Sequence, residues 1–138
     1  SWEREQTMFG YKMHGNSIQA RIAYENFKKL DNKKHELNKI RNAFNVGLDY
    51  NNLSLHLYRL RVKDNNNFVE QMKQAGIQCG VHYKAFHKSP LLKNMVKFKP
   101  MPKSELEETQ TVSIPFHEKL TQENLEHIIK HVKKFRDI

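Results

Sequence analysis

Residues 53–62, LSLHLYRLRV, decide the fold class, because they predict a β-strand placed between two helical patterns. Their apolar residues occupy odd positions as far as Leu57 and even positions from Tyr58 onward. A strand that is covered on both faces shows such a change of parity, and so does a strand that contains a bulge. The sequence leaves both explanations open.

A long helical pattern precedes this strand and begins after Asn16, a residue that favours the N-cap position. From residue 17 to residue 44, apolar residues recur at spacings of three, four and seven, which predicts one apolar stripe. A continuous helix of this length would measure ~42 Å, whereas a compact domain is about 30 Å wide. We therefore expect part of the stripe to contact polypeptide outside this chain. A break within the polar residues 31–38 is the competing explanation.

The elements after the strand are shorter. Asn67 and Glu70 predict a capping box at the start of a helix, and Gly76 predicts its left-handed end. We then expect, in order, a strand over 77–83, a basic loop over 84–103, a helical turn over 104–109, a strand over 111–114 and a helix after Thr121. This order predicts an α+β fold, in which helices cover a small, mostly antiparallel sheet and a long helix lies at the N-terminal end.

The charge of the chain is positive but is carried mostly by lysine. The 138 residues include 24 Lys and Arg against 15 Asp and Glu, a net charge of +9, and only 6 of the basic residues are Arg. Arg is the residue that binds phosphates and bases with two parallel hydrogen bonds, so nucleic acid is not the expected partner. No apolar run approaches the roughly 20 residues that a membrane span needs. A single cysteine, Cys79, favours a reducing compartment, and we expect the cytoplasm.

Two groups of residues invite a chemical interpretation. Cys79, His82 and His87 lie within nine residues, and His127 and His131 are one helical turn apart. No second cysteine is present and neither group forms an HExxH or CxxC pattern, so we expect no metal site. Cys79 falls within a predicted strand, where a small apolar side chain is normally buried. We therefore expect no catalytic residue in this chain.

Three motifs resemble one enzyme family. Residues 10–20, GYKMHGNSIQA, resemble the element G-Y-N-x-R-[ML]-x-[DE]-[IL]-Q-A of the DegT/DnrJ/StrS family of pyridoxal-phosphate (PLP) sugar aminotransferases. Residues 76–83, GIQCGVHY, followed by His87, resemble the family's G-I-x-x-x-x-H-Y-x-x-x-H. Residues 112–121 resemble its S-L-P-x-H-x-x-L-[ST] ending. The motifs occur in the family's order and together span most of the chain.

The resemblance implies that this chain is the C-terminal domain of such an enzyme. Residues 1–15 would form an inter-subunit loop and residues 16–138 the small domain of a fold type I aminotransferase. The missing N-terminal large domain would supply the Schiff-base lysine, which no lysine of this chain matches in context, so the piece alone would be inactive. The complete enzyme would be a PLP-dependent homodimer that aminates a nucleotide-linked keto-sugar, with glutamate as the expected amino donor.

The resemblance also implies roles for particular residues. Lys12 and His14 match positions of the family's loop that reaches the PLP phosphate of the neighbouring subunit, where the family has Asn and Arg. An ammonium binds phosphate as a point charge. His82, Tyr83 and His87 match the segment that helps to close the nucleotide-sugar pocket. There, Tyr83 would offer a stacking face and His82 a hydrogen bond to a sugar hydroxyl or phosphate.

Two functions of other classes remain open from the sequence. The first is a standalone basic module that binds nucleic acid or another acidic partner, which predicts a steep dependence of binding on salt. The second is a non-catalytic dimerisation or regulatory fragment descended from an aminotransferase, in which Lys12 and Gly15 mark lost function.

Overall fold

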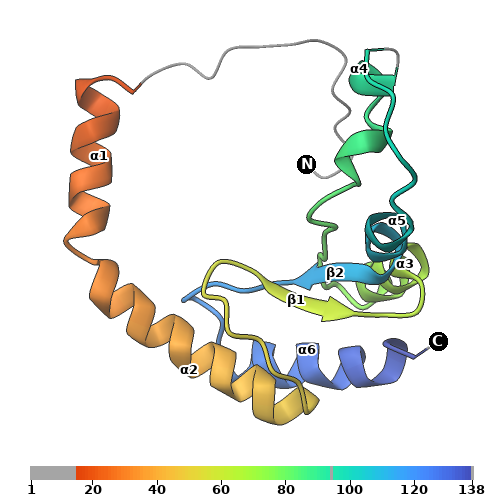
Figure 1. Cartoon of the computed structure of the whole chain (residues 1–138). Helices are drawn as coiled ribbons and strands as arrows, with labels where there is room; N and C mark the ends of the chain where they lie inside the picture. The colour runs from red at the N-terminus through yellow and green to blue at the C-terminus, as the bar shows by residue number, and fades with distance from the viewer. Residues whose placement is uncertain (1–14, 94, 138) are drawn as a thin grey trace.

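The computed structural model describes residues 15–93 and 95–137 (Figure 1). Along the chain lie the helices and strands α1 (Ser17–Phe27), α2 (Leu30–Leu48), β1 (Tyr58–Arg61), α3 (Asn65–Gln74), the 3-10 helix η1 (Phe86–Lys88), α4 (Pro90–Lys93), α5 (Pro102–Gln110), β2 (Thr111–Ile114) and α6 (Gln122–Phe135). The two strands form one small antiparallel sheet, and helices cover one of its faces. The predicted α+β class is therefore confirmed.

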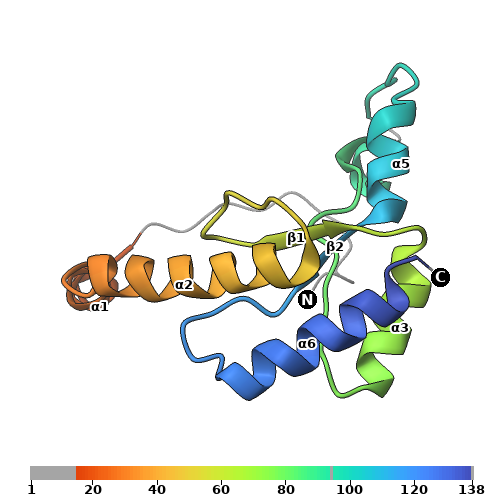
Figure 2. The same cartoon turned by 90° about the horizontal axis from the view of Figure 1, so that it is seen from below.

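The sheet has one apolar and one polar face. Tyr58 pairs with Ile114 and Arg61 with Thr111. Because side chains alternate along a strand, Tyr58 faces the opposite way from Arg59 and Arg61. Tyr58 is buried beneath the sheet, where α2 and α6 pack side by side (Figures 1 and 2), whereas both arginines are exposed.

The core lies between α2, α6 and the sheet. The rings of Phe44 and Tyr58 are 5.0 Å apart between centroids, and the Tyr58 hydroxyl donates to Asn45 Oδ1 at 2.8 Å. Burial raises the pKa of Tyr58 to about 12. At Gly47, a Cβ atom would stand 2.5 Å from Ile129 Cδ1, so this glycine lets α2 and α6 approach closely. A single hydrophobic core therefore joins α2, the sheet, α3 and α6.

The helix ends follow the predicted chemistry with one exception. Asn16 and Thr121 each form a capping box with the residue three positions later. Gly76 has a φ of +76°, as predicted for a residue after a helix. At α3, however, Asp64 and not Asn67 is the N-cap, and its carboxylate accepts from the backbone amides of residues 66 and 67. Asp64 precedes Asn67 and already satisfies the first orphan amides, so the helix begins there.

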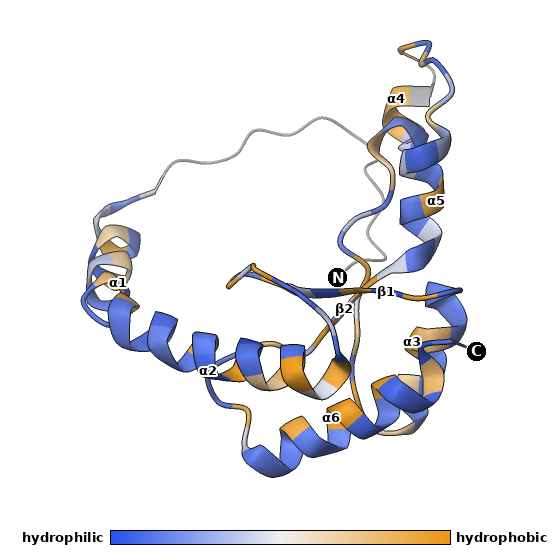
Figure 3. Ribbon diagram, turned by 60° about the horizontal axis from the view of Figure 1, so that its bottom comes forward, coloured by the Kyte–Doolittle hydropathy of each residue, from blue (hydrophilic) through white to orange (hydrophobic). Residues whose placement is uncertain are grey.

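The predicted N-terminal helix consists of two helices. The break falls at Lys28–Lys29, just before the polar segment 31–38 in which the competing explanation placed it. The second helix, α2, buries one face, and α1 buries none of its residues and extends away from the core (Figures 1 and 3). The predicted apolar stripe is thus covered within the described chain only along α2.

One predicted strand is shorter than expected, and another does not form. Residues 53–57 are a loop, because Asn52 Nδ2 donates to the Leu57 carbonyl oxygen at 3.0 Å and Ser54 Oγ accepts from the His56 amide. Such side-chain bonds compete with strand pairing, and they explain the change of parity along residues 53–62. The prediction of a strand over 77–83 is wrong, because this segment forms only an isolated bridge between Gly80 and Ser113.

The arm, defined as residues 83–93 and 95–110, stands on the polar face of the sheet (Figures 1 and 2). The predicted basic loop contains η1 and α4, and the predicted turn over 104–109 is the nine-residue helix α5, which begins at Pro102. At the base of the arm, Asn65 Nδ2 donates to the carbonyl oxygens of Glu108 and Thr111 at 2.7 and 3.1 Å. None of the described helices is long and apolar enough to cross a membrane.

Candidate substrate cleft

A cleft of about 490 Å³ lies between the arm and the polar face of the sheet. Arg59 of β1 and Thr111 of β2 contribute the sheet side of its lining. The structure also brings together His82, Tyr83 and His87, the three predicted substrate-binding residues, in the lining of this cleft. The cleft has the volume of a typical small-molecule site.

His82 is half-buried and has an unpaired ring nitrogen. Its Nδ1 is buried and has no hydrogen-bond partner among residues 15–93 and 95–137. Burial, followed by the nearby charge of His56, lowers the pKa of His82. The imidazole is therefore neutral at pH 7, and one of its nitrogens donates while the other accepts. A neutral His82 suits a hydrogen bond to an uncharged hydroxyl of a ligand.

Aromatic side chains make the cleft suitable for a flat ligand. Tyr83 is 74% exposed, and its ring stands edge-on to that of His82, with 5.2 Å between centroids. Phe86 and Phe98, 65% and 37% exposed, also line the cleft. Exposed aromatic rings of this kind favour stacking against a base or the apolar face of a sugar.

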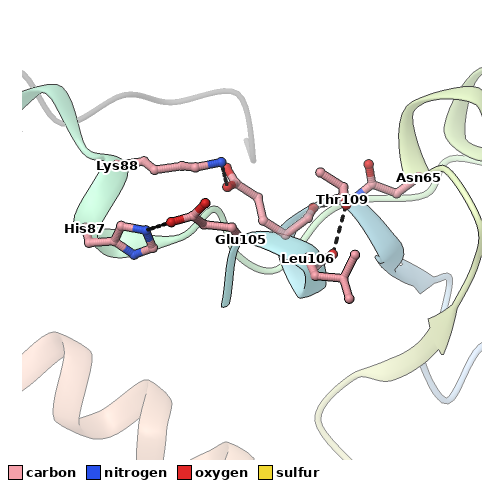
Figure 4. Close-up of polar contacts among 7 residues, drawn as sticks. Asn65, His87, Lys88, Glu105, Leu106 and Thr109 are labelled. Carbon is pink, nitrogen blue, oxygen red and sulfur yellow. Dashed lines mark hydrogen bonds and ion pairs between the residues drawn. The ribbon is translucent and has the colours of Figure 1, made fainter. Parts of the chain in front are cut away.

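His87 joins η1 to α5. Its Nε2 donates to Glu105 Oε1 at 3.1 Å (Figure 4), and the ring packs edge-on against Phe98. The hydrogen bond from His87 lowers the pKa of the Glu105 carboxyl. With only 12% of its side chain exposed, His87 has its orientation fixed by these contacts. It is better placed to orient the wall of the cleft than to move toward a ligand.

Lys88 forms a second cross-link beside the first. Its Nζ lies 2.7 Å from Glu108 Oε2 (Figure 4), and this hydrogen bond raises the pKa of Lys88. The two pairs connect adjacent residues of η1 to α5 one helical turn apart. They therefore hold the segment that carries Tyr83 and His87 against α5.

Of two cations in the cleft, Arg59 was missed from the sequence, and Lys103 was placed only in the basic loop over 84–103. Arg59 and Lys103 both line the cleft. The alternation of Tyr58, Arg59 and Leu60 gives the signal that places Arg59 on the polar face of β1. Nothing in the local sequence indicates that the arm folds over that face, so the juxtaposition of Arg59 and Lys103 depends on the tertiary structure.

The two predicted cofactor-binding residues, Lys12 and His14, lie outside the described residues.

Cys79, His127 and His131 are engaged in structural contacts. Cys79 is buried, and burial raises the pKa of its thiol to about 12, so the nucleophilic thiolate is scarcely populated at neutral pH. His127 Nε2 donates to the Ala75 carbonyl oxygen at 3.0 Å, and His131 Nδ1 donates to the His127 carbonyl oxygen at 2.8 Å. Among the described residues, no three His, Cys, Asp or Glu side chains are grouped so as to hold a metal ion.

Comparisons of sequence identify relatives of the chain. The DegT/DnrJ/EryC1/StrS aminotransferase family matches residues 2–133. An uncharacterized protein of Methanocaldococcus jannaschii is 26% identical over 156 residues, a match that covers 97% of this chain and 40% of the relative.

Solved structures share the fold. PseC of Helicobacter pylori, an aminotransferase involved in the biosynthesis of pseudoaminic acid, is similar with a TM-score of 0.78 and 20% identity, covering 94% of this chain and 40% of PseC. A candidate sugar aminotransferase of Streptococcus pneumoniae in its PLP-form is similar with a TM-score of 0.79 and 22% identity, covering 97% and 39%. This chain therefore spans about 40% of the length of these relatives. Because the family match extends over nearly the whole sequence, the chain belongs to the DegT/DnrJ/EryC1/StrS aminotransferase family.

Proposed function

We propose that this chain is the small C-terminal domain of a PLP-dependent aminotransferase that converts a nucleotide-linked keto-sugar to an amino-sugar, with glutamate as amino donor. The family match supports the reaction class. The observation that supports the substrate class best is the cleft, in which His82, Tyr83 and His87 lie together beside further aromatic rings. The enzyme would work in the cytoplasm.

The proposed domain organisation assigns residues 1–15 to an inter-subunit loop and residues 16–138 to the small domain. A large N-terminal domain supplies the lysine that binds PLP, and Lys12 and His14 contact the PLP phosphate of the neighbouring subunit. PLP, when bound, supplies the electron sink for transamination. A lysine that binds PLP works in a sheltered pocket that lowers its pKa. Each lysine whose side chain the structure describes is exposed, which supports a lysine elsewhere.

Each residue of the cleft has a proposed role in holding the substrate. Tyr83 stacks on the base or the sugar ring, since its ring is largely exposed. His82, which lines the cleft with a neutral ring, exchanges a hydrogen bond with a sugar hydroxyl. His87, fixed by Glu105, keeps the wall of the cleft in place.

The exposed face of α1 supports the proposed assembly with the large domain and a second subunit. Ile18, Ile22 and Phe27 are 70%, 58% and 70% exposed, an unusual state for apolar residues of an amphipathic helix. Contact with the missing polypeptide would remove these side chains from water.

Complementation tests the proposal. The chain is mixed with a lysine-bearing large domain, PLP, glutamate and a nucleotide-linked keto-sugar, and the amino-sugar is detected by mass spectrometry. We expect product from the mixture and none from either part alone. The matched control is the same large domain with its lysine replaced by alanine. Absence of product from a mixture in which both parts are folded and associated would contradict the proposal.

A further inference from the structure

Two arginines of β1 occupy the same face of the sheet but have different surroundings. Arg61 Nη2 lies 3.0 Å from Glu107 Oε1, and its guanidinium also donates to Gln110 Oε1. The guanidinium of Arg59, two residues earlier, forms no ion pair and no side-chain hydrogen bond with the residues that the structure describes, unlike that of Arg61. The guanidinium that lines the cleft is thus the one without a protein counter-charge in the described part of the chain.

The carboxylates that line the cleft already have cationic partners. Glu107 is paired with Arg61 and Glu108 with Lys88, and neither of these cations lines the cleft. Within residues 15–93 and 95–137, Lys103 has no carboxylate within 4.0 Å either. Arg59 and Lys103 are therefore the two lining cations that no described carboxylate neutralises, and a bound anion would supply the missing counter-charge.

The other side chains of the cleft narrow the class of anion. The exposed rings of Tyr83 and Phe86 lie in the same cleft as the two cations. A simple inorganic anion does not stack on aromatic rings. A nucleoside diphosphate, by contrast, has a flat base that stacks on such rings and a charged diphosphate that Arg binds with two hydrogen bonds. The volume of about 490 Å³ suits a ligand of that size.

We propose that Arg59, assisted by Lys103, binds the diphosphate of the nucleotide-linked substrate while the aromatic wall of the cleft receives its base. This inference rests on the proposed function, because it specifies how the substrate of that reaction is held. It places the diphosphate at Arg59 of β1 and Lys103 of α5, and the base at the rings of Tyr83 and Phe86. Arg59 is thus a binding residue that selects for a negatively charged carrier on the sugar.

Isothermal titration calorimetry of the full chain tests the proposal by measuring the dissociation constants of three probes: uridine diphosphate, uridine and inorganic pyrophosphate. We expect Arg59→Ala to weaken the binding of uridine diphosphate and pyrophosphate by about tenfold and to leave uridine within about twofold. The matched control is Arg21→Ala, which removes the same charge from α1, on the opposite side of the molecule from the arm (Figure 1). We expect the affinity of Arg59→Lys for the phosphate probes to lie between those of the wild type and Arg59→Ala, because lysine keeps the positive charge but lacks the two parallel donors of a guanidinium.

A second pair of variants tests the electrostatic argument. Arg61→Ala leaves Glu107 unpaired in the cleft, so we expect weaker binding of both phosphate probes although Arg59 is intact. Adding Glu107→Gln to Arg61→Ala removes the repelling charge and restores the affinity. Circular dichroism confirms that each variant is folded.

The proposal is overturned if the wild-type chain binds neither phosphate probe, or if Arg59→Ala and Arg21→Ala have equal effects. These outcomes are distinguishable from failure of the proposed function. Phosphate binding that depends on Arg59, together with failed complementation, would refute the transaminase and uphold the cleft assignment. Successful complementation together with phosphate binding that does not depend on Arg59 would uphold the transaminase and refute the cleft assignment.

Discussion

Helices α1 and α6 begin in the same way and end in opposite environments. Each has a capping box, formed by Asn16 in α1 and by Thr121 in α6. Each also has apolar residues at helical spacing. α6 buries four of them against α2 and the sheet, whereas α1 buries none (Figures 1 and 3). Local sequence therefore fixes where a helix starts and which face is apolar, and the rest of the polypeptide fixes whether that face is covered.

The largest expected difference comes from the same substitution made in both helices. Ile128 of α6 is 4% exposed and Ile22 of α1 is 58% exposed. We expect Ile128→Ala to lower the free energy of unfolding by about 2–5 kcal/mol, because it leaves a cavity in the core. We expect Ile22→Ala to stay within about 0.5 kcal/mol. Urea denaturation of the chain measures both. Equal losses of stability for the two variants would contradict the difference between α1 and α6, since they would mean that Ile22 is packed in a core.

The two capping boxes give a smaller difference. Thr121→Ala removes the acceptor for the Asn124 amide, and we expect a loss of about 1 kcal/mol in the free energy of unfolding. Asn16→Ala removes the equivalent acceptor for the Gln19 amide, and because α1 buries nothing we expect only local fraying. Hydrogen exchange of the amides in the first turn of α1 detects that fraying. A loss of global stability with Asn16→Ala would argue against an unpacked α1.

Helix α5 is intermediate between the exposed α1 and the buried α6, and we expect its pH dependence to be the smallest of the three effects. It buries no residue, like α1, but Glu105 and Glu108 tie it to η1. The pKa of Glu105 is lowered from 4.5, so its contribution to stability is present above that pH and is lost as the pH falls through the lowered value. We expect the protection of α5 amides to decline below about pH 4.5. Glu105→Gln should abolish this decline, whereas a decline that persists would assign it to other groups.

Much of the secondary structure could be predicted from local chemistry. Asn16, Thr121 and Gly76 act where the sequence placed them, because capping and the left-handed conformation depend on a few adjacent residues. Strand length was predicted less well. Residues 53–57 have an apolar alternation, yet the side chains of Asn52 and Ser54 hold them as a loop.

The candidate site could be predicted only in part. The motif GIQCGVHY with His87 is enough to locate three residues of the cleft, because they lie close together in the chain. Arg59 and Lys103 are separated by more than forty residues and become neighbours of the same cleft only because β1 pairs with β2 and α5 leads into β2. No local pattern contains that pairing.

The sequence by itself determined where α1 and α6 start, which residues are apolar, and the family to which the motifs point, since each depends on residues close together in the chain. The tertiary structure alone decided that α6 is covered and α1 is not, that β1 presents Arg59 to the arm, and that Arg61 and Lys88 neutralise the acids of the cleft. These features depend on distances between residues remote in sequence, and such distances are set when the whole core is packed.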